Sequence, residues 1–555
     1  MIRKPGQSGR RYRPRPSSNQ ADEEEEATFR PDPVEDEQSA IRPDSRAVLL
    51  QHLLESDDAD SGRAERVVTE RDTAETSDAT LPDFSKHLES ALSRAKYRIA
   101  CRSSPQFGRS IYAMEDIPAG ATVYECVPAA CVVDDAHLSR FCSGCFQPNG
   151  RFRCSRCTIV HYCSEICLKS DWPFHKTECK GFQNVAPRKP TTAVRQVGRL
   201  LTLQQTPSPS SILMQSLVTH RGDYSTSHLE AFTQMSVLVK LIRKHEQLEA
   251  STMLDHFCRM GCNSMTICDR ELSGIGVGLY PELSLLNHSC DPNCFLVFSG
   301  CKASLRVLRP IHQGQQLFLS YIDVTDPAGL RKKELGSRYF FDCKCTLCEN
   351  EADDPRHRWS CLDSACTGFV CVTDPFEELQ TAACSECGPL EISKLEAFER
   401  RRKDLAASHI KTAKSQHSGE LRRQVEQARS VLKAGNTLLV RALKQLLDVQ
   451  ISSGVWEDAL PTCSELLDNY KQILDPRHPT IAIQTFVLAK LASAATPQDA
   501  AHRPECRAQL TWAVQKMRDA AQATERSMGT AHALHREVAE TLGGIEAELA
   551  AMAVP

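Results

Sequence analysis

Apolar residues recur at helical spacing through two long stretches of the chain. Between residues 192 and 260 the apolar positions are separated by three or four residues, as in Leu229, Phe232, Met235, Val239 and Ile242. From about residue 394 to the end, Ala, Leu, Glu, Lys and Arg dominate with the same spacing. Apolar residues at this period mark the buried face of an amphipathic helix. Both stretches are therefore predicted to be helical.

Other parts of the chain show short apolar runs separated by turn residues. Ile111–Ala113 and Thr122–Tyr124 predict two strands, with a turn at Ile117–Gly120 between them. Residues 263–325 return to the same pattern of short strands and turns. We expect order to begin near Tyr97. Strands in the middle and helices on either side predict an α+β multidomain protein.

The N-terminal part of the chain is distinguished by blocks of charge. Residues 1–17 hold six Lys or Arg and no acid, and residues 18–80 hold nineteen acids against six bases. Such blocks with few aromatic residues do not bury enough apolar surface to fold. We expect residues 1–85 to form a disordered charged extension. Its basic start could serve as a nuclear signal or a weak nucleic-acid contact, although a solvated tail is the simpler interpretation.

Cysteine is the unusual feature of an otherwise ordinary composition. The 555 residues are 41% hydrophobic and 25% charged with a net charge of -4, but they include 26 cysteines. No apolar run is long enough for a signal peptide or a membrane span. We therefore expect a reducing compartment, in which clustered cysteines bind metal ions more often than they form disulfides.

The first cysteine cluster has the spacing of two closed zinc sites. Its eight candidate ligands are Cys142, Cys145, Cys154, Cys157, Cys163, Cys167, His175 and Cys179. Eight soft ligands complete two tetrahedral sites with no open position, so their zinc ions would be structural. The ligand pairs could be used sequentially or interleaved. Short linkers favour the interleaved arrangement, in which the first and third pairs share one ion and the second and fourth share the other.

Two further groups of cysteines follow. Cys343, Cys345 and Cys348 supply three thiolates, and Cys290 is the natural fourth ligand. The second group comprises Cys361, Cys366, Cys384 and Cys387 within residues 355–392. Its spacing is compatible with a zinc ribbon, in which Cys371 could replace one ligand. The alternative is a hairpin with incidental thiols.

Several motifs in the middle of the chain occur together in one protein family. They are Cys262–Ile267, Gly276–Pro281, Asn287-His288-Ser289-Cys290, the strand Phe318–Tyr321 and the aromatic run Tyr339–Phe341. Together with the first cysteine cluster, which resembles a MYND finger, they make the chain similar to the SET and MYND domain (SMYD) family of protein lysine methyltransferases. The resemblance is strong over residues 97–350 and weak over 395–555.

This resemblance implies a fold and its division into domains. A SET β-fold split over 97–325 would contain the MYND zinc finger (142–179) and a helical SET insertion (190–260). A cysteine-rich post-SET zinc segment (326–350) and the ribbon would follow. A tetratricopeptide (TPR)-like α-helical domain would occupy 395–555.

The resemblance also implies a cofactor and named site residues. S-adenosylmethionine would be bound by Phe107, Gly108, Arg109, Asn263, Asn287, His288, Tyr321 and Phe341. Tyr321 would be catalytic, and Tyr321, Tyr339 and Phe341 would wall the lysine channel. The sequence departs from the family at Phe107, where a basic residue is common. It departs again at Ser110, where glycine is usual, and at Gln315–Gln316, where two acids are usual.

The sequence thus predicts a protein-lysine N-methyltransferase that acts on histone tails or other lysine-bearing proteins. Three zinc ions are expected, and a fourth if the ribbon binds one. We also expect a monomer with no membrane association, in nucleus and cytoplasm. One alternative is a catalytically silent zinc adaptor that binds proline-rich peptides through the finger. Another is a nucleic-acid-binding regulator that uses the basic tail and the finger.

Overall fold

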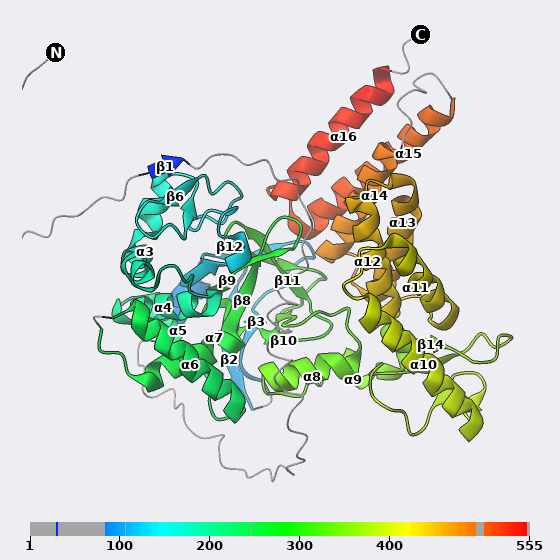
Figure 1. Cartoon of the computed structure of the whole chain (residues 1–555), viewed down its shortest axis with the longest axis horizontal. Helices are drawn as coiled ribbons and strands as arrows, with labels where there is room; N and C mark the ends of the chain where they lie inside the picture. The colour runs from blue at the N-terminus through cyan, green and yellow to red at the C-terminus, as the bar shows by residue number, and fades with distance from the viewer. Residues whose placement is uncertain (1–28, 32–83, 106, 245, 496–503, 552–555) are drawn as a thin grey trace, which may run out of the picture.

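The computed structural model describes residues 29–31, 84–105, 107–244, 246–495 and 504–551. Strands and helices from the first two thirds of the chain form one body, and the C-terminal helices form a second body beside it (Figure 1). Most of the charged extension predicted for 1–85 lies outside the described residues. None of the described helices is long and apolar enough to cross a membrane.

Short strands from distant parts of the chain build the first body. β2 pairs with β3, β4 pairs with β12 beside β11, and β9 lies between β5 and β8. β10 pairs in parallel with β13. The bounds of these strands are Ile99–Ser104 (β2), Gly108–Ala113 (β3), Thr122–Cys126 (β4), Ala130–Val133 (β5), Ser264–Cys268 (β8), Gly274–Leu279 (β9), Asn287–His288 (β10), Cys294–Ser299 (β11), Lys302–Val307 (β12) and Phe318–Leu319 (β13).

Two of these strands qualify the sequence analysis. The predicted runs Ile111–Ala113 and Thr122–Tyr124 lie within β3 and β4, but these strands do not pair with each other. β3 instead pairs with β2, and β4 pairs with β12 from residues 302–307. A hairpin-like spacing of two strands therefore does not identify their partners.

The first cysteine cluster folds as an insertion between β5 and β8. It contains β6 (Phe152–Cys154), β7 (His161–Tyr162) and α3 (Glu165–Val185). The short strand β1 (Phe29–Pro31) pairs antiparallel with β6, so part of the N-terminal extension is ordered. The predicted helical stretch then provides α4 (Thr192–Gln205), α5 (Pro209–Gln215), α6 (Thr226–Ile242) and α7 (Ala250–Asn263).

A helix that the sequence analysis did not predict precedes β2. α2 (Phe84–Leu92) buries Phe84, Leu88 and Leu92. Order therefore begins before Tyr97 in this part of the chain, contrary to expectation. The apolar residues lie one or two turns apart and form a single stripe. The charged segment before them obscured this short signal.

The segment after β13 passes from the strand-rich body to the helical domain. It contains α8 (Ala328–Arg338), α9 (Thr346–Glu349) and a four-stranded sheet with the order β14-β15-β16-β17. These strands span Arg358–Ser360, Phe369–Cys371, Ala383–Cys384 and Gly388–Pro389. The sheet belongs to the same apolar core as the helices that follow, because Trp359 packs against Phe398 with ring centroids 5.9 Å apart.

Helices make up the C-terminal domain, as the apolar spacing predicted. Consecutive helices pack against one another and share buried Leu, Val and Ala side chains. The helices are α10 (Ile392–Thr412), α11 (Ser418–Val431), α12 (Thr437–Ser452), α13 (Trp456–Ile473), α14 (Pro479–Ala494), α15 (Pro504–Met528) and α16 (Ala533–Ala551).

Buried polar contacts hold the two bodies together around a cleft. Arg306 of β12 donates to the carbonyl of Ser527 at 2.7 Å, beside the C-terminal end of α15. Thr437 of α12 donates to the carbonyl of Thr325 at 2.6 Å. The cleft between the bodies has a volume of 3010 Å³ and extends to Tyr321 and Tyr339. The fold therefore leaves a large open path to the strand tyrosine.

Candidate active site

The parallel pair β10–β13 brings the Asn-His motif beside the strand that leads to Tyr321. Asn287 lies opposite Phe318, and His288 lies opposite Leu319. Asn287 Nδ2 donates to the carbonyl of Phe107 at 2.9 Å and to Ser110 Oγ at 2.7 Å. The structure thus joins the β2–β3 turn, β10 and β13 at one place.

Ser110 gains a structural role from this contact. Its side chain is fully buried, and its hydroxyl accepts from the asparagine amide. The serine that stands in place of the usual glycine therefore accepts a hydrogen bond from the Asn-His motif. The ring of Phe107, in contrast, is 43% exposed and packs edge-on against Phe318 at 6.3 Å.

The β2–β3 turn leaves room for a ligand next to its backbone. Gly108 has a φ of +60°, a left-handed conformation that favours glycine. A Cβ atom at this position would meet nothing within 4 Å. This exposed turn therefore leaves its backbone accessible, and it does not obstruct S-adenosylmethionine at the predicted position.

Two more of the predicted cofactor residues contact a single loop. Arg109 Nη2 donates to the carbonyl of Ser216 at 2.7 Å, and Asn263 Nδ2 donates to the carbonyl of Val218 at 2.9 Å. We call residues 216–225 the α5–α6 loop. Asn263 ends α7 and also donates to the carbonyl of Arg259 at 2.8 Å. Both side chains are thereby fixed from the same side.

Tyr321 is held in a buried aromatic corner. Its hydroxyl donates to the carbonyl of Leu286 at 2.6 Å. Its ring lies 4.9 Å from the ring of Tyr339 and 6.4 Å, at 90°, from that of Phe341. Burial raises the pKa of Tyr321 well above its usual value, so the phenol stays protonated at physiological pH.

His288 connects this corner to the neighbouring thiols. The backbone N–H of Tyr321 donates to His288 Nδ1 at 3.0 Å, and His288 Nε2 lies 3.2 Å from Cys290 Sγ. Because Nδ1 accepts, the proton of the neutral ring is on Nε2 and points at the sulfur. The ring therefore contributes to the site by joining Tyr321 to a cysteine.

The cysteine beside His288 belongs to a group of four. Cys290, Cys343, Cys345 and Cys348 have sulfur atoms that all lie within 4.8 Å of one another. They share an apolar cluster with Tyr321, Tyr339 and Phe341. Four thiolates at this separation fit a tetrahedral zinc ion with no open position. We call this group the post-SET centre.

The cysteines of the insertion form two interleaved groups. Cys142 and Cys145 gather with Cys163 and Cys167, and Cys154 and Cys157 gather with His175 and Cys179. Within each group the ligand atoms lie within 4.8 Å of one another, which also fits zinc. The side chain of Ser164 accepts from the N–H of Cys167 and caps α3, which fixes the turn that carries this cysteine.

A buried ionic network that the sequence analysis missed links the second group to strand β5. Glu178 Oε2 lies 3.6 Å from His175 Nδ1, and Arg199 contacts Glu178 and Asp171, each at 2.8 Å. Arg199 Nη1 also donates to the carbonyl of Cys131 in β5 at 2.9 Å. All three charged side chains are nearly inaccessible. Their pairing across 21 and 28 residues leaves no local sequence signal.

The fourth group lies in the four-stranded sheet. Cys361, Cys366, Cys384 and Cys387 also have sulfur atoms within 4.8 Å of one another. Cys371 lies outside this group, and its thiol faces the carbonyl of Glu351 at 3.6 Å. Cys387 is exposed. We call this group the ribbon centre, and its donor set also fits zinc.

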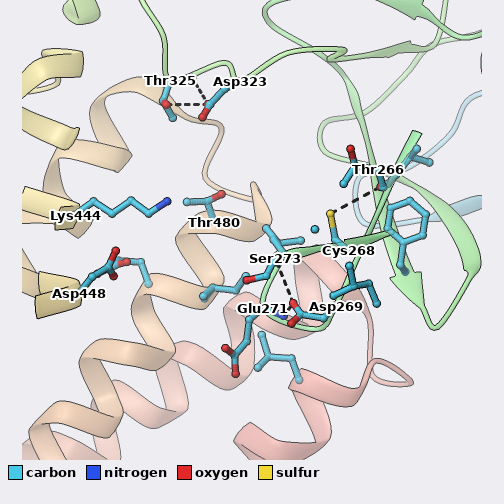
Figure 2. A pocket seen from close by; sticks show the side chains of 18 of the residues that line it. Thr266, Cys268, Asp269, Glu271, Ser273, Asp323, Thr325, Lys444, Asp448 and Thr480 are labelled. Carbon is cyan, nitrogen blue, oxygen red and sulfur yellow. Dashed lines mark hydrogen bonds between the residues drawn. The ribbon is translucent and has the colours of Figure 1, made fainter. Parts of the chain in front are cut away.

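Polar side chains of both signs line the cleft in front of the site. Lys444 and Asp448 project from α12 toward the β8–β9 turn, which carries Asp269 and Glu271 (Figure 2). Asp323 lies near Tyr321 in the chain and accepts from the N–H and hydroxyl of Thr325, each at 2.8 Å. The walls therefore offer charged groups to an extended polypeptide rather than a closed pocket to a small molecule.

The chain is similar to proteins that include named lysine methyltransferases. A family model for the SET domain matches residues 108–322. Histone-lysine N-methyltransferase ASHR1 of Arabidopsis thaliana is 29% identical over 411 residues, which cover 70% of this chain and 85% of that protein. Histone-lysine N-methyltransferase SMYD3 of Mus musculus is 33% identical over 258 residues, covering 44% of this chain and 60% of that protein. SET domain and MYND-type zinc finger protein 6 of Schizosaccharomyces pombe is 34% identical over 250 residues, covering 44% and 51%.

The fold, the site and these relatives define the class of the protein as a SET-domain protein-lysine N-methyltransferase. Within this class the chain is similar to SET and MYND domain proteins.

Proposed function

We propose that Tyr321 and its neighbours align a lysine side chain for methylation by S-adenosylmethionine, with histone and other lysine-bearing proteins as substrates. The observation that carries this proposal is the Tyr321 hydroxyl, which meets the Leu286 carbonyl beside the His288 and Phe341 rings. When bound, the cofactor supplies an electrophilic methyl group on a sulfonium. The residues of the chain must then align and desolvate the acceptor amine.

The hydrogen bonds of Tyr321 support its proposed role in orienting the amine. Its proton is directed at the Leu286 carbonyl, so toward the lysine amine the phenol oxygen would act as the acceptor of an N–H. An amine that donates an N–H to this oxygen has its lone pair directed away from Tyr321, where it can accept the methyl group. The Tyr339 ring beside it offers a π face that attracts a partly cationic amine.

The size and charge of the cleft support protein substrates. A volume of 3010 Å³ exceeds what a small molecule needs, and the walls carry both acidic and basic side chains. The relatives are named as histone-lysine and N-lysine methyltransferases, which agrees with a polypeptide acceptor.

We further propose that the insertion at 142–179 is a MYND finger and that 395–555 is a TPR-like domain closing the cleft. The interleaved ligand groups and the packing of consecutive helices support these assignments. The finger would present a binding surface for proline-rich peptides, with nucleic acid a weaker ligand. A monomer in nucleus and cytoplasm completes the proposal.

Replacement of Tyr321 by phenylalanine tests the proposed catalytic role. We expect Tyr321→Phe to lower the methyl-transfer rate by about 10²–10³-fold, because one positioned polar contact is lost. Calorimetry should give unchanged affinity for S-adenosylhomocysteine. Tyr97→Phe, which removes a hydroxyl elsewhere in the same domain, serves as the matched control. A wild-type rate in Tyr321→Phe would refute the role.

A further inference from the structure

Three consecutive aromatic residues follow α8, and the middle one points away from the site. Tyr339 packs on Tyr321, and Phe341 packs on His288 with ring centroids 5.9 Å apart. The Phe340 ring instead lies 4.7 Å from the ring of Tyr224 and 5.4 Å from that of His220. Both of its partners belong to the α5–α6 loop.

The backbone of Phe340 makes this placement costly. Its φ is +61°, in the left-handed region that a bulky side chain rarely adopts. The residue directly follows Tyr339, the C-cap of α8, at a position where glycine is the usual choice. Strain of this kind persists only where surrounding contacts enforce it, and it concentrates at functional sites. The aromatic contacts of the Phe340 ring are therefore the candidate cause.

The loop beneath Phe340 is itself clamped to the end of α7. Tyr224 donates its hydroxyl to the carbonyl of Cys258 at 3.2 Å. A Cβ atom at Gly261 would lie 2.3 Å from that hydroxyl oxygen, so the tyrosine occupies the space of a side chain. Arg338, two residues before Phe340, donates to the carbonyl of Gly261 at 3.4 Å. Gly261 is thus the point where the α5–α6 loop, α7 and α8 meet.

The same loop receives the side chains of two cofactor-pocket residues. The carbonyls of Ser216 and Val218 accept from Arg109 and Asn263. Six residues after Val218, Tyr224 contacts the ring of Phe340. The α5–α6 loop therefore touches the cofactor pocket at one end and, through Phe340, the aromatic wall of the lysine channel at the other.

We propose that Phe340 is a positioning residue that locks Tyr339 and Phe341 to the α5–α6 loop and thereby couples the lysine channel to the cofactor pocket. This inference rests on the proposed function, because it assigns those two rings to the lysine channel. Binding of the cofactor beside Arg109 and Asn263 stabilises the loop, and the loop fixes the channel. Conversely, loss of the Phe340 ring weakens cofactor binding from a position outside the pocket.

Two substitutions at Phe340 separate its ring from its backbone. Phe340→Ala removes the ring and keeps a side chain that disfavours positive φ, whereas Phe340→Gly removes the ring and relieves the backbone. We expect both to lower the initial rate of methyl transfer to recombinant core histones by about 10–100-fold at saturating cofactor. Both should also weaken S-adenosylhomocysteine binding by about fivefold or more in calorimetry. Phe340→Tyr, which keeps the ring, should retain both properties.

The contact between Phe340 and the α5–α6 loop can also be disturbed from the loop, at Tyr224. Gly261→Ala places a methyl group against the Tyr224 hydroxyl and should reproduce both defects. The double variant Gly261→Ala, Tyr224→Phe removes the clashing oxygen, and the nearest ring carbon then lies 3.4 Å from the added Cβ. We expect it to recover affinity and rate. Such a rescue would show that the contact between Gly261 and the Tyr224 hydroxyl, rather than a general loss of the fold, causes both defects.

The outcomes are decisive in each direction. Wild-type affinity and rate in Phe340→Gly would overturn the proposal, because the backbone rather than the ring would then matter. Failure of Tyr224→Phe to rescue Gly261→Ala would overturn the clamp. If the wild-type protein transfers no methyl group, the proposed function fails. The S-adenosylhomocysteine affinities of the same variants still test the coupling.

Discussion

The post-SET centre and the ribbon centre each consist of four cysteine thiols, but they lie in different surroundings. In the post-SET centre, Cys290 faces His288, and its cluster includes Tyr321, Tyr339 and Phe341. In the ribbon centre, Cys387 is exposed, and Cys361 and Cys384 belong to the core of the helical domain. The four thiols therefore fit zinc in both centres. The neighbouring residues determine which part of the protein is disturbed when the zinc is removed.

The two cysteine groups of the proposed finger at 142–179 divide in the same way. The group that contains His175 is joined through Glu178 and Arg199 to the SET strand β5, and its residues are all buried. The group that contains Cys145 is only partly buried. Sequence considerations alone suggest that the finger, as an insertion with closed sites, can lose its metal without harm to cofactor binding. The Arg199 network indicates that this independence holds for only one of its centres.

The largest effect is expected from Cys345→Ser. Loss of the post-SET zinc frees the segment that carries Tyr339 and Phe341, so methyl transfer should fall below detection. Elemental analysis should show one zinc ion fewer than in the wild-type protein. Full activity in a variant that has lost this ion would remove the distinction between the two centres.

Arg199→Met is expected to cause the next largest effect. Two buried carboxylates lose their counter-ion, which costs about 3–5 kcal/mol of folding free energy. The variant should also release finger zinc to a chelator faster than the wild type. Arg195→Met is the matched control, because Arg195 is a buried arginine of the same helix that pairs with the half-exposed Asp135. Equal folding free energies and zinc-release rates in the two variants would show that the His175–Glu178–Arg199 link does not stabilise the zinc site.

His288→Ala should have a moderate effect on two properties at once. The ring accepts from the Tyr321 backbone and directs its other nitrogen at Cys290. Loss of a group that orients a ligand lowers metal affinity by about 10–100-fold. Calorimetry should also show weaker binding of S-adenosylmethionine. His312→Ala, at a side chain that is 72% exposed, is the control, and unchanged zinc and cofactor affinity in His288→Ala would contradict the bridge.

The smallest effect is expected from Cys387→Ser. The ribbon metal should be lost, and the helical domain should lose part of its stability, because the binding of a structural metal contributes to folding. The methyl-transfer rate at saturating substrate should remain that of the wild type. A loss of activity as large as in Cys345→Ser would show that the ribbon centre also shapes the active site.

Sequence patterns predicted those features that depend on residues close together in the chain. The thiols of Cys142, Cys145, Cys163 and Cys167 gather as the interleaved spacing indicated, because short linkers limit which pairs can meet. The C-terminal helices follow from a regular apolar period. The short α2 was missed because its apolar stripe spans only nine residues and a charged segment precedes it.

Sequence patterns did not predict features that depend on residues far apart in the chain. Arg199 pairs with acids 21 and 28 residues away on another helix, and nothing in its neighbourhood marks it. The left-handed backbone of Phe340 contradicts its residue type and is visible only in three dimensions. The cleft likewise exists because two bodies meet, so its walls combine residues from separate domains.

The most direct test of the account is the site of methyl transfer. The zinc-loaded wild-type protein is incubated with methyl-labelled S-adenosylmethionine and a mixture of core histones and cell-lysate proteins, and the labelled residue is identified by mass spectrometry. The account predicts label on the Nε atom of lysine, and its loss in Tyr321→Phe despite retained S-adenosylhomocysteine binding. A wild-type protein that binds the cofactor and labels no lysine, or a Tyr321→Phe variant that labels it equally well, would contradict the account.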